Sequence, residues 1–206
     1  MKSARFLALL AVLAASICAS ASTIYSNRVA WTSQVTGVTA ENFDAYQGLL
    51  TASLPLGNAT FSVPGYTTGD PLWVSCSGCY SPIGIALVGN YSMTTVEGMF
   101  ATPVGAVGAD ISNLMINDNL AVNVEINNTW YSWSVPYTYP SSVFWGIVAG
   151  PGESIDGINF SPVNGYWVGI DNFSYGSSGT PEPGTIAMFG TGVLGAVGLL
   201  RRKLML

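Results

Sequence analysis

The side chains in this sequence that could do chemistry are almost all carboxylates. Between Ser22 and Gly179, ten acidic residues stand against one basic residue, Arg28, which gives a net charge of −9. The sequence has no histidine, which excludes the usual general base, the Ser-His-Asp and Cys-His catalytic arrangements and nearly all zinc sites. A surface this acidic repels phosphate backbones, so we expect no nucleic-acid partner.

Paired carboxylates can still perform the acid–base work of a glycoside hydrolase. Glu153 with Asp156, or Asp110 with Asp118, would be such pairs. Any acidic domain offers pairs of this kind, and these have no distinctive spacing. An enzyme is therefore the third hypothesis, after a non-catalytic surface protein and a carbohydrate-binding module.

Asp171 is the acid whose surroundings suggest a metal ion. If residues 166–175 form an unbroken strand, one of its faces carries Trp167, Gly169, Asp171, Phe173 and Tyr175. A carboxylate between aromatic side chains needs backbone N–H groups, Arg28 or a cation as its partner. The sequence leaves open a hydrogen-bonded Asp and a structural calcium site. Calcium accepts carboxylates and carbonyls together, and its expected further ligands are Asp110, Asp44 and Glu41.

Aromatic residues crowd into positions 130–145, and flat rings beside Asn and Asp are suited to stacking on sugar rings. In the predicted strand 129–135, Trp130 points opposite to Tyr131 and Trp133, so both faces of the strand carry a ring. These three side chains are the candidate glycan-binding residues. The alternative is that they pack in the core or cover a sheet.

Two cysteines, Cys76 and Cys79, lie in the segment Cys-Ser-Gly-Cys. No βαβ pattern surrounds them, which argues against a redox motif, and we expect a local disulfide. A loop that small removes little chain entropy, so the bond would contribute on the order of 2 kcal/mol and stabilise only a turn.

The elements that must position these side chains are predicted to be β-strands. Residues 120–126 and 129–135 alternate between apolar and polar side chains and flank Asn127-Asn128, which predicts a hairpin because Asn tolerates positive φ. Gly, Pro, Asn and Ser separate the other short β-branched and aromatic runs. The further strands expected are 59–63, 72–75, 83–88, 94–100, 106–111, 143–149, 155–160 and 166–175. Strands at this spacing predict an all-β, antiparallel β-sandwich.

Both ends of the chain have the pattern of targeting segments. Lys2 and Arg5 precede an apolar stretch that ends at Ala19-Ser20-Ala21, which predicts a signal peptide over residues 1–21. Near the C-terminus, an apolar run from Thr185 to Leu200 would form a helix of about 24 Å, a marginal span for a hydrocarbon core of about 30 Å. The basic cluster after this run favours a cytoplasmic C-terminus and an extracytoplasmic body.

The tail resembles the PEP-CTERM sorting signal of diderm bacteria. The resemblance is carried by Pro181, Glu182 and Pro183, by the Gly-rich apolar run, and by Arg201, Arg202 and Lys203. It implies recognition by an exosortase, a membrane protease-transpeptidase, followed by removal of the tail. The partners it implies are the exosortase and the inner membrane. The protein would be held there transiently, then reach the cell surface or the extracellular space.

The body also resembles carbohydrate-binding-module-like jelly rolls, through residues 100–110, Trp145-Gly-Ile-Val and residues 168–176. This resemblance implies an extracellular polysaccharide as the partner. The expected organisation is a signal peptide (1–21), a jelly-roll-like β-sandwich (22–176), and a linker with a transmembrane segment and basic tail (177–206). Apart from the structural calcium ion, no cofactor is expected.

Overall fold

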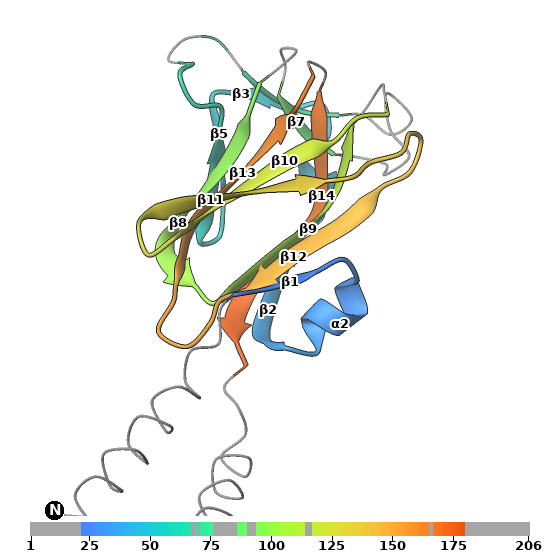
Figure 1. The fold of residues 1–206 in the computed structure, drawn as a ribbon. Coiled ribbons are helices and arrows are strands. Elements are labelled where there is room, and N and C mark those ends of the chain that lie inside the picture. Colours follow the sequence, from blue (N-terminus) through green and yellow to red (C-terminus); the bar gives the residue numbers. More distant parts are fainter. Residues whose placement is uncertain are drawn as a thin grey trace, which may run out of the picture.

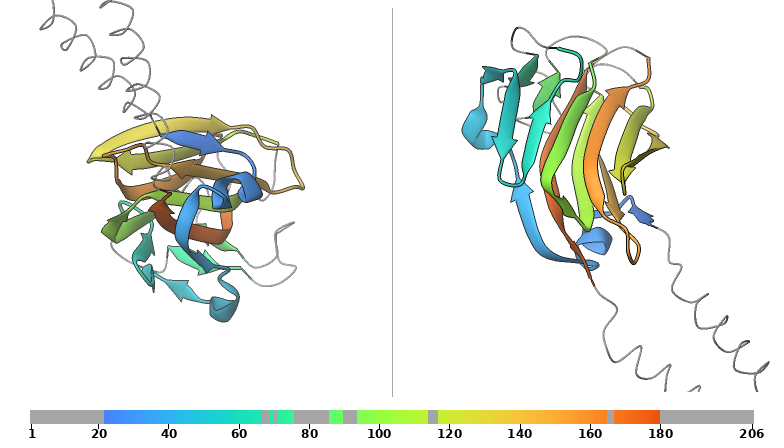
Figure 2. Two further views of the ribbon diagram at one scale, coloured as in Figure 1. Left: turned by 90° about the horizontal axis from the view of Figure 1, so that it is seen from below. Right: turned by 90° about the vertical axis from the view of Figure 1, so that its left-hand side faces the viewer.

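A computed structural model describes residues 22–66, 69, 71–75, 86–89, 94–113, 117–164 and 167–179. Two antiparallel sheets pack face to face, which confirms the predicted β-sandwich (Figures 1 and 2). The elements are β1 (Thr23–Tyr25), α2 (Arg28–Thr32), β2 (Val35–Glu41), the 3-10 turn η1 (Asp44–Tyr46), β3 (Leu50–Thr51), β4 (Ser53–Leu56), β5 (Ala59–Ser62), β6 (Leu72–Val74), β7 (Leu87–Gly89), β8 (Val96–Val104), β9 (Ala106–Asn113), β10 (Leu120–Ile126), β11 (Thr129–Val135), β12 (Val143–Val148), β13 (Ile155–Pro162) and β14 (Val168–Ser178).

The two sheets differ in size. Sheet A has the strand order β1-β12-β9-β14-β7-β6-β3, and β2 also pairs with β14. Sheet B has the order β11-β10-β13-β8-β5-β4. At one side of the sandwich, therefore, the edge strand β11 of sheet B faces the edge strand β1 of sheet A.

The predicted hairpin is present, and its turn explains its register. Asn127 and Asn128 have φ of 49° and 61°, the left-handed conformation that a two-residue hairpin turn requires. Ile126 therefore pairs with Thr129, and the pairing continues to Leu120 with Val135. In β10 every second side chain is buried, so its apolar residues face the core and Asn123 and Glu125 face outward.

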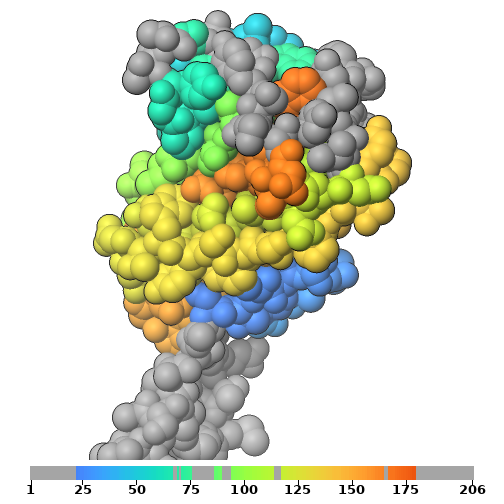
Figure 3. Space-filling model, turned by 45° about the horizontal axis from the view of Figure 1, so that its top comes forward, coloured from blue at the N-terminus to red at the C-terminus, as the bar shows by residue number. Residues whose placement is uncertain are grey.

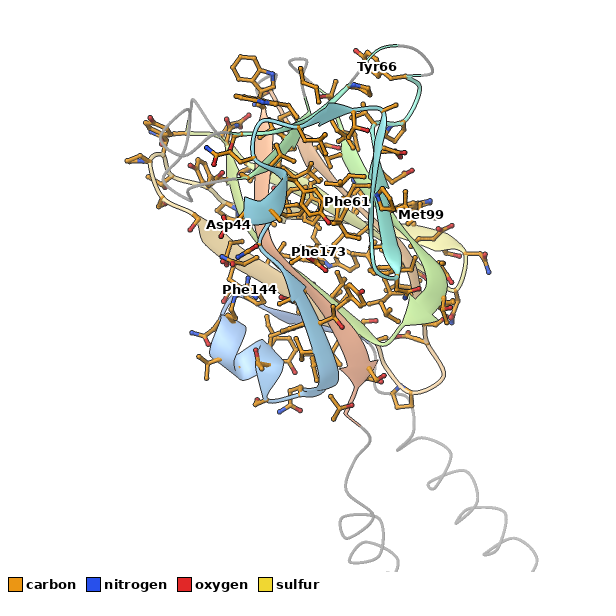
Figure 4. The ribbon with its side chains drawn as sticks, turned by 180° about the vertical axis from the view of Figure 1, so that it is seen from behind. Asp44, Phe61, Tyr66, Met99, Phe144 and Phe173 are labelled. Atoms are coloured by element: carbon orange, nitrogen blue, oxygen red, sulfur yellow. The ribbon has the colours of Figure 1, made fainter. Side chains whose placement is uncertain are left out.

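The core between the sheets is rich in aromatic rings. Phe61 of β5 and Phe173 of β14 meet edge to face with centroids 4.8 Å apart, and Figure 4 shows them inside the sandwich. Phe43 packs against Phe61 at 5.9 Å. Such pairs contribute about 0.5–1.5 kcal/mol beyond the area they bury, so these rings fix the sheets against one another.

The last strand is not the unbroken strand that the sequence predicts. Asp171 pairs with Asp110 and Ser174 pairs with Gly108, so β14 contains one more residue than β9 over this stretch, and Asn172 has φ of 47°. This β-bulge reverses the alternation. Phe173 and Tyr175 enter the core, whereas Asp171 lies with Asp110 on the outer face of sheet A. The expectation that Asp171, Phe173 and Tyr175 share one face is therefore wrong.

The N-terminal segment covers part of that outer face, and the sequence did not predict its helix. Asn27 caps α2 by accepting a hydrogen bond from the Ala30 N–H at 3.0 Å. Trp31 is fully buried, and its Nε1 donates to the Ile147 carbonyl at 3.1 Å. This side chain packs α2 against β12, and Arg28 at the start of the helix also contacts β12 through the Phe144 ring.

Several predicted features lie outside the described residues: the signal peptide, Cys76 with Cys79, and the tail from residue 180 onward. Within the described part of the chain, no helix has the length and apolar character needed to cross a membrane.

Candidate functional site

The three candidate glycan-binding residues lie on β11, at the edge of sheet B, and point to two different surfaces. Tyr131 and Trp133 pair with Val124 and Val122, whose side chains face the core, so they lie on the inner side of the sheet. Trp130 pairs with Glu125 on the outer side. The exposed fractions of Trp130 and Tyr131 are 41% and 48%. The prediction that both faces of this strand carry a ring is confirmed.

Trp133 lines a groove of about 560 Å³ along the open side of the sandwich, where β11 lies next to β1 and β12. Figure 3 shows the blue N-terminal segment directly beside the yellow β10–β11 hairpin. The groove is lined by Ile24, Tyr25, Ser26, Trp133, Ser134, Val135, Pro136, Ser142, Val143, Phe144 and Trp145.

The groove and the strand next to it carry a row of rings. The Tyr131 and Trp133 centroids are 6.3 Å apart, and those of Trp133 and Trp145 are 5.7 Å apart. Trp145 is almost fully buried, and its ring packs against that of Trp133. The polar side chains of the lining are serines and Tyr25, and none is charged. Rings and hydroxyl groups without charge suit a neutral ligand with both apolar faces and hydroxyl groups.

Sequence reasoning missed two rings of this groove, Tyr25 and Phe144. Tyr25 belongs to a three-residue strand, and only its pairing with Gly146 brings it to the groove. A strand that short has no alternation from which to predict its position.

The outer face of sheet B is a second surface, and it is polar. Asn123 Nδ2 donates to Asn159 Oδ1 at 2.5 Å, and Asn159 in turn hydrogen-bonds the Glu97 carboxylate. Burial raises the pKa of Glu97, the nearby Glu125 carboxylate raises it further, and the Asn159 hydrogen bond lowers it. These residues were not predicted as a site. The alternation in β10 nevertheless places Asn123 and Glu125 together on the outward face of that strand.

The predicted calcium ligands lie on and near the outer face of sheet A. Arg28 donates from Nη2 to Asp110 Oδ2 at 3.1 Å and to the Asn172 carbonyl at 3.0 Å, and from Nη1 to Ser174 Oγ at 3.1 Å. Its guanidinium also lies 4.6 Å from the centre of the Phe144 ring. Asp171 accepts a hydrogen bond of 2.6 Å from the Asn172 N–H. The two carboxylates thus have protein partners.

These residues do not fit a calcium site well. Among the described residues, no three or more Asp, Glu, Cys or His side chains come together as a metal site would require. Glu41 of β2 pairs with Phe173 of β14, and Asp44 accepts a hydrogen bond from the Asn42 amide at 2.9 Å. Calcium binding by Asp171, Asp110, Asp44 and Glu41 stays a prediction, and the geometry favours Arg28 as the cation.

The carboxylates considered for catalysis also have structural partners. Glu153 Oε2 accepts from the Gly150 N–H at 2.7 Å and from Ser22 Oγ at 2.6 Å. Asp118 accepts from the backbone N–H of Asn164 at 2.9 Å. Asp156 accepts from the Asn128 N–H at 3.1 Å. Each holds a loop in place.

Comparison with known proteins relates the tail to a family of sorting motifs and the body to solved structures. Residues 180–203 match the family model of the PEP-CTERM protein-sorting motif, which indicates an exported surface protein processed by an exosortase. This match confirms the resemblance carried by Pro181-Glu182-Pro183 and Arg201-Arg202-Lys203. No curated protein matches the chain.

Among solved structures, the chain is similar to carbohydrate-binding modules of family 29. A variant of the module CBM29-2 has 14% sequence identity and a TM-score of 0.42, covering 72% of this chain and 99% of that chain. The module CBM29_1 from Piromyces equi has 8% identity and a TM-score of 0.41, covering 71% and 95%. A family two carbohydrate esterase from Cellvibrio japonicus has 12% identity and a TM-score of 0.34, covering 61% and 36%.

Proposed function

We propose that this protein is a non-catalytic β-sandwich that is exported, cleaved by an exosortase at its C-terminal signal and delivered to the cell surface or the extracellular matrix. The observation that carries the proposal is the sorting motif over residues 180–203. The motif begins two residues after the end of β14 at Ser178, so cleavage near it would leave every described strand in the mature protein. The pattern of residues 1–21 supports export by a cleaved signal peptide.

Intact-mass measurement of the protein from its host tests this proposal. We expect a mature species that lacks residues 1–21 and the apolar run from Thr185 to Leu200. In a strain without the exosortase, the species should retain that run. A wild-type mature protein that still contains the run would overturn the proposal.

Carbohydrate binding is a second candidate function, and the groove beside β11 favours it. Tyr131 and Trp133 offer rings for stacking on sugars, the buried Trp145 ring packs against Trp133, and serine hydroxyls line the same groove.

Pull-down with neutral polysaccharides tests this second function. Trp133→Ala in the groove and Tyr131→Ala beside Trp133 should each weaken binding roughly tenfold, while Tyr139→Ala, an exposed ring at neither position, should not. Thermal unfolding checks that each variant remains folded, which matters most for the half-buried Trp133. If no neutral polysaccharide binds, or if the groove variants bind as well as the wild type, the groove is not a glycan site.

A further inference from the structure

The outer face of sheet B is unusual because polar groups continue across four strands. At one level, cross-strand pairing aligns Ser132 of β11, Asn123 of β10, Asn159 of β13 and Glu97 of β8. One level further along are Trp130, Glu125, Gly157 and Met99. Four neighbouring strands span about 14 Å, which is long enough for a short oligosaccharide.

Among the described residues, no basic side chain lies on this face to balance its carboxylates. The nearby Glu125 carboxylate disfavours ionisation of Glu97, and both side chains are half-buried. In the part of the chain that the structure describes, Arg28 is the one basic side chain, and it is paired with Asp110 on sheet A. A half-buried carboxylate pair without a counter-ion is unfavourable, and a bound cation would relieve the repulsion.

An exposed ring lies directly beside Glu125. Trp130 is the cross-strand partner of Glu125, and its ring reaches over Gly157, where an added Cβ would lie 3.4 Å from Cη2 of Trp130. The same Cβ would lie 2.6 Å from the Met99 sulfur, so a side chain at 157 would push the end of Met99 away and would touch the Trp130 ring. Gly157 thus lets Trp130 and Met99 form one apolar platform. Their exposed fractions are 41% and 37%.

A hollow of about 450 Å³ continues the surface past Glu97. Its lining includes Tyr66, Thr95, Glu97 and Asn159. Figure 4 labels Tyr66 and Met99 at two separate places on this side of the molecule. The surface therefore has an apolar platform at one end, a ladder of amides and carboxylates in the middle, and a hollow at the other.

We propose that this face binds an amino-sugar polymer whose amines are unacetylated and positively charged. Protonated amines would lie against Glu97 and Glu125, a sugar ring would stack on Trp130, and Asn123 and Asn159 would hydrogen-bond the ring hydroxyls. The charge of the face selects against anionic polymers, and the ring beside a carboxylate selects a cationic sugar over a simple cation. The inference rests on the carbohydrate-binding function proposed above, and it assigns a separate surface to a specific class of glycan.

Calorimetric titration of the full chain in detergent tests the proposal, with glucosamine hexamer and its fully N-acetylated counterpart as ligands. We expect the unacetylated hexamer to bind at least about tenfold more tightly, with an affinity that falls as salt is added. The double variant with Glu97→Gln and Glu125→Gln should bind the two hexamers with about equal affinity. Trp130→Ala should weaken binding of both hexamers. Asp118→Asn, which removes one negative charge from the loop before β10, should leave binding unchanged.

Three results would overturn the inference. These are equal or tighter binding of the acetylated hexamer, unchanged affinity in the double Gln variant, and binding of polylysine with the same affinity and no effect of Trp130→Ala. The groove variant Trp133→Ala distinguishes this failure from that of carbohydrate binding itself. If neutral polysaccharide binding depends on Trp133 but the amino-sugar hexamer does not bind, only this inference fails. If no glycan binds, both fail.

Discussion

At the scale of single residues, Arg28 joins three segments that are far apart in the sequence. It contacts Asp110 on β9, the Asn172 carbonyl and Ser174 Oγ on β14, and the Phe144 ring on β12. The sequence predicted Arg28 as one possible partner of Asp171, but the salt bridge goes to Asp110. The bulge at Asn172 contributes to this arrangement, because it places the Asn172 carbonyl where the same Arg28 nitrogen that contacts Asp110 can donate to it.

Arg28→Ala should destabilise the domain by about 2–3 kcal/mol, since it leaves Asp110 near Asp171 without a cation. Arg28→Lys should restore only part of this, because an ammonium cannot make the same set of directed contacts. Urea unfolding measures both effects. A change below about 0.5 kcal/mol in Arg28→Ala would show that the contacts are not stabilising. If Arg28 is the cation of this cluster, calcium added to the wild type should leave Tm unchanged, whereas a rise in Tm would support the predicted calcium site.

Asp171 should make the stability of the domain depend on pH. Its pKa is raised from 3.8 to about 6, mainly because burial disfavours the charged carboxylate; Asp110 and Asp44 add to the effect, while the Asn172 N–H opposes it. A group whose pKa is higher in the folded state costs stability when it is ionised. The cost of Asp171 is therefore present above about pH 6 and disappears as the pH falls toward 4.

Asp171→Asn should consequently raise Tm at pH 7.5 by roughly 2–4 °C, which is about 1 kcal/mol for a domain of this size. At pH 4 the difference from the wild type should vanish. Comparing the two proteins at each pH removes the contribution of the other carboxylates. A difference that stays the same at both pH values would mean that ionisation of Asp171 is not its cause.

At the scale of elements, the strands with strong alternation were predictable and the N-terminal ones were not. The ranges expected for β10, β11 and β13 agree with the structure within about two residues, because each alternates clearly. The strand β2 is mostly exposed and contains Gly37 at φ 62°, so its sequence lacks a buried face. The helix α2 has five residues, too few to show a helical period.

Trp31 should account for most of the attachment of α2. Trp31→Ala removes a fully buried ring and the hydrogen bond to Ile147, and we expect a loss of about 3–5 kcal/mol. Trp31→Phe should cost less, since it keeps a ring beside Phe144 at the 5.9 Å contact. Val29→Ala, at a position with 78% exposure on the same helix, is the control and should change stability little. Chemical denaturation would show whether the three differ in this order.

The candidate sites could also be predicted from the sequence only where the pattern within one hairpin was enough. Pairing within the hairpin was enough to predict that Trp130 faces away from Tyr131 and Trp133. The groove and the polar ladder, by contrast, depend on strands distant in the sequence, such as β1 beside β12 and β8 beside β13. Only the completed sheets bring Tyr25 to Trp133, or Glu97 to Asn159.

At the scale of the whole molecule, the strand next to the sorting signal is central to the fold. β14 pairs with β9, β2 and β7, and Gly179 N–H donates to the Gln34 carbonyl at 2.8 Å. A chain of residues 22–179 should therefore fold with the cooperativity of the longer protein. A chain that stops at Asp171 should not fold, because it lacks Phe173 and Tyr175 of the core. Near-UV circular dichroism of the two truncations distinguishes them, and native signal from the shorter one would contradict the prediction.

The position of β14 also determines how the domain responds to mechanical load. Figure 1 shows the described chain beginning and ending at the same end of the sandwich, with β14 running toward that end. A pull on the C-terminus acts along the strand, while its hydrogen bonds to β9 and β2 lie across it. The load is then shared by many bonds in shear instead of opening them one after another. We therefore expect β14 to withstand a pull on the C-terminus better than an edge strand with one neighbour would.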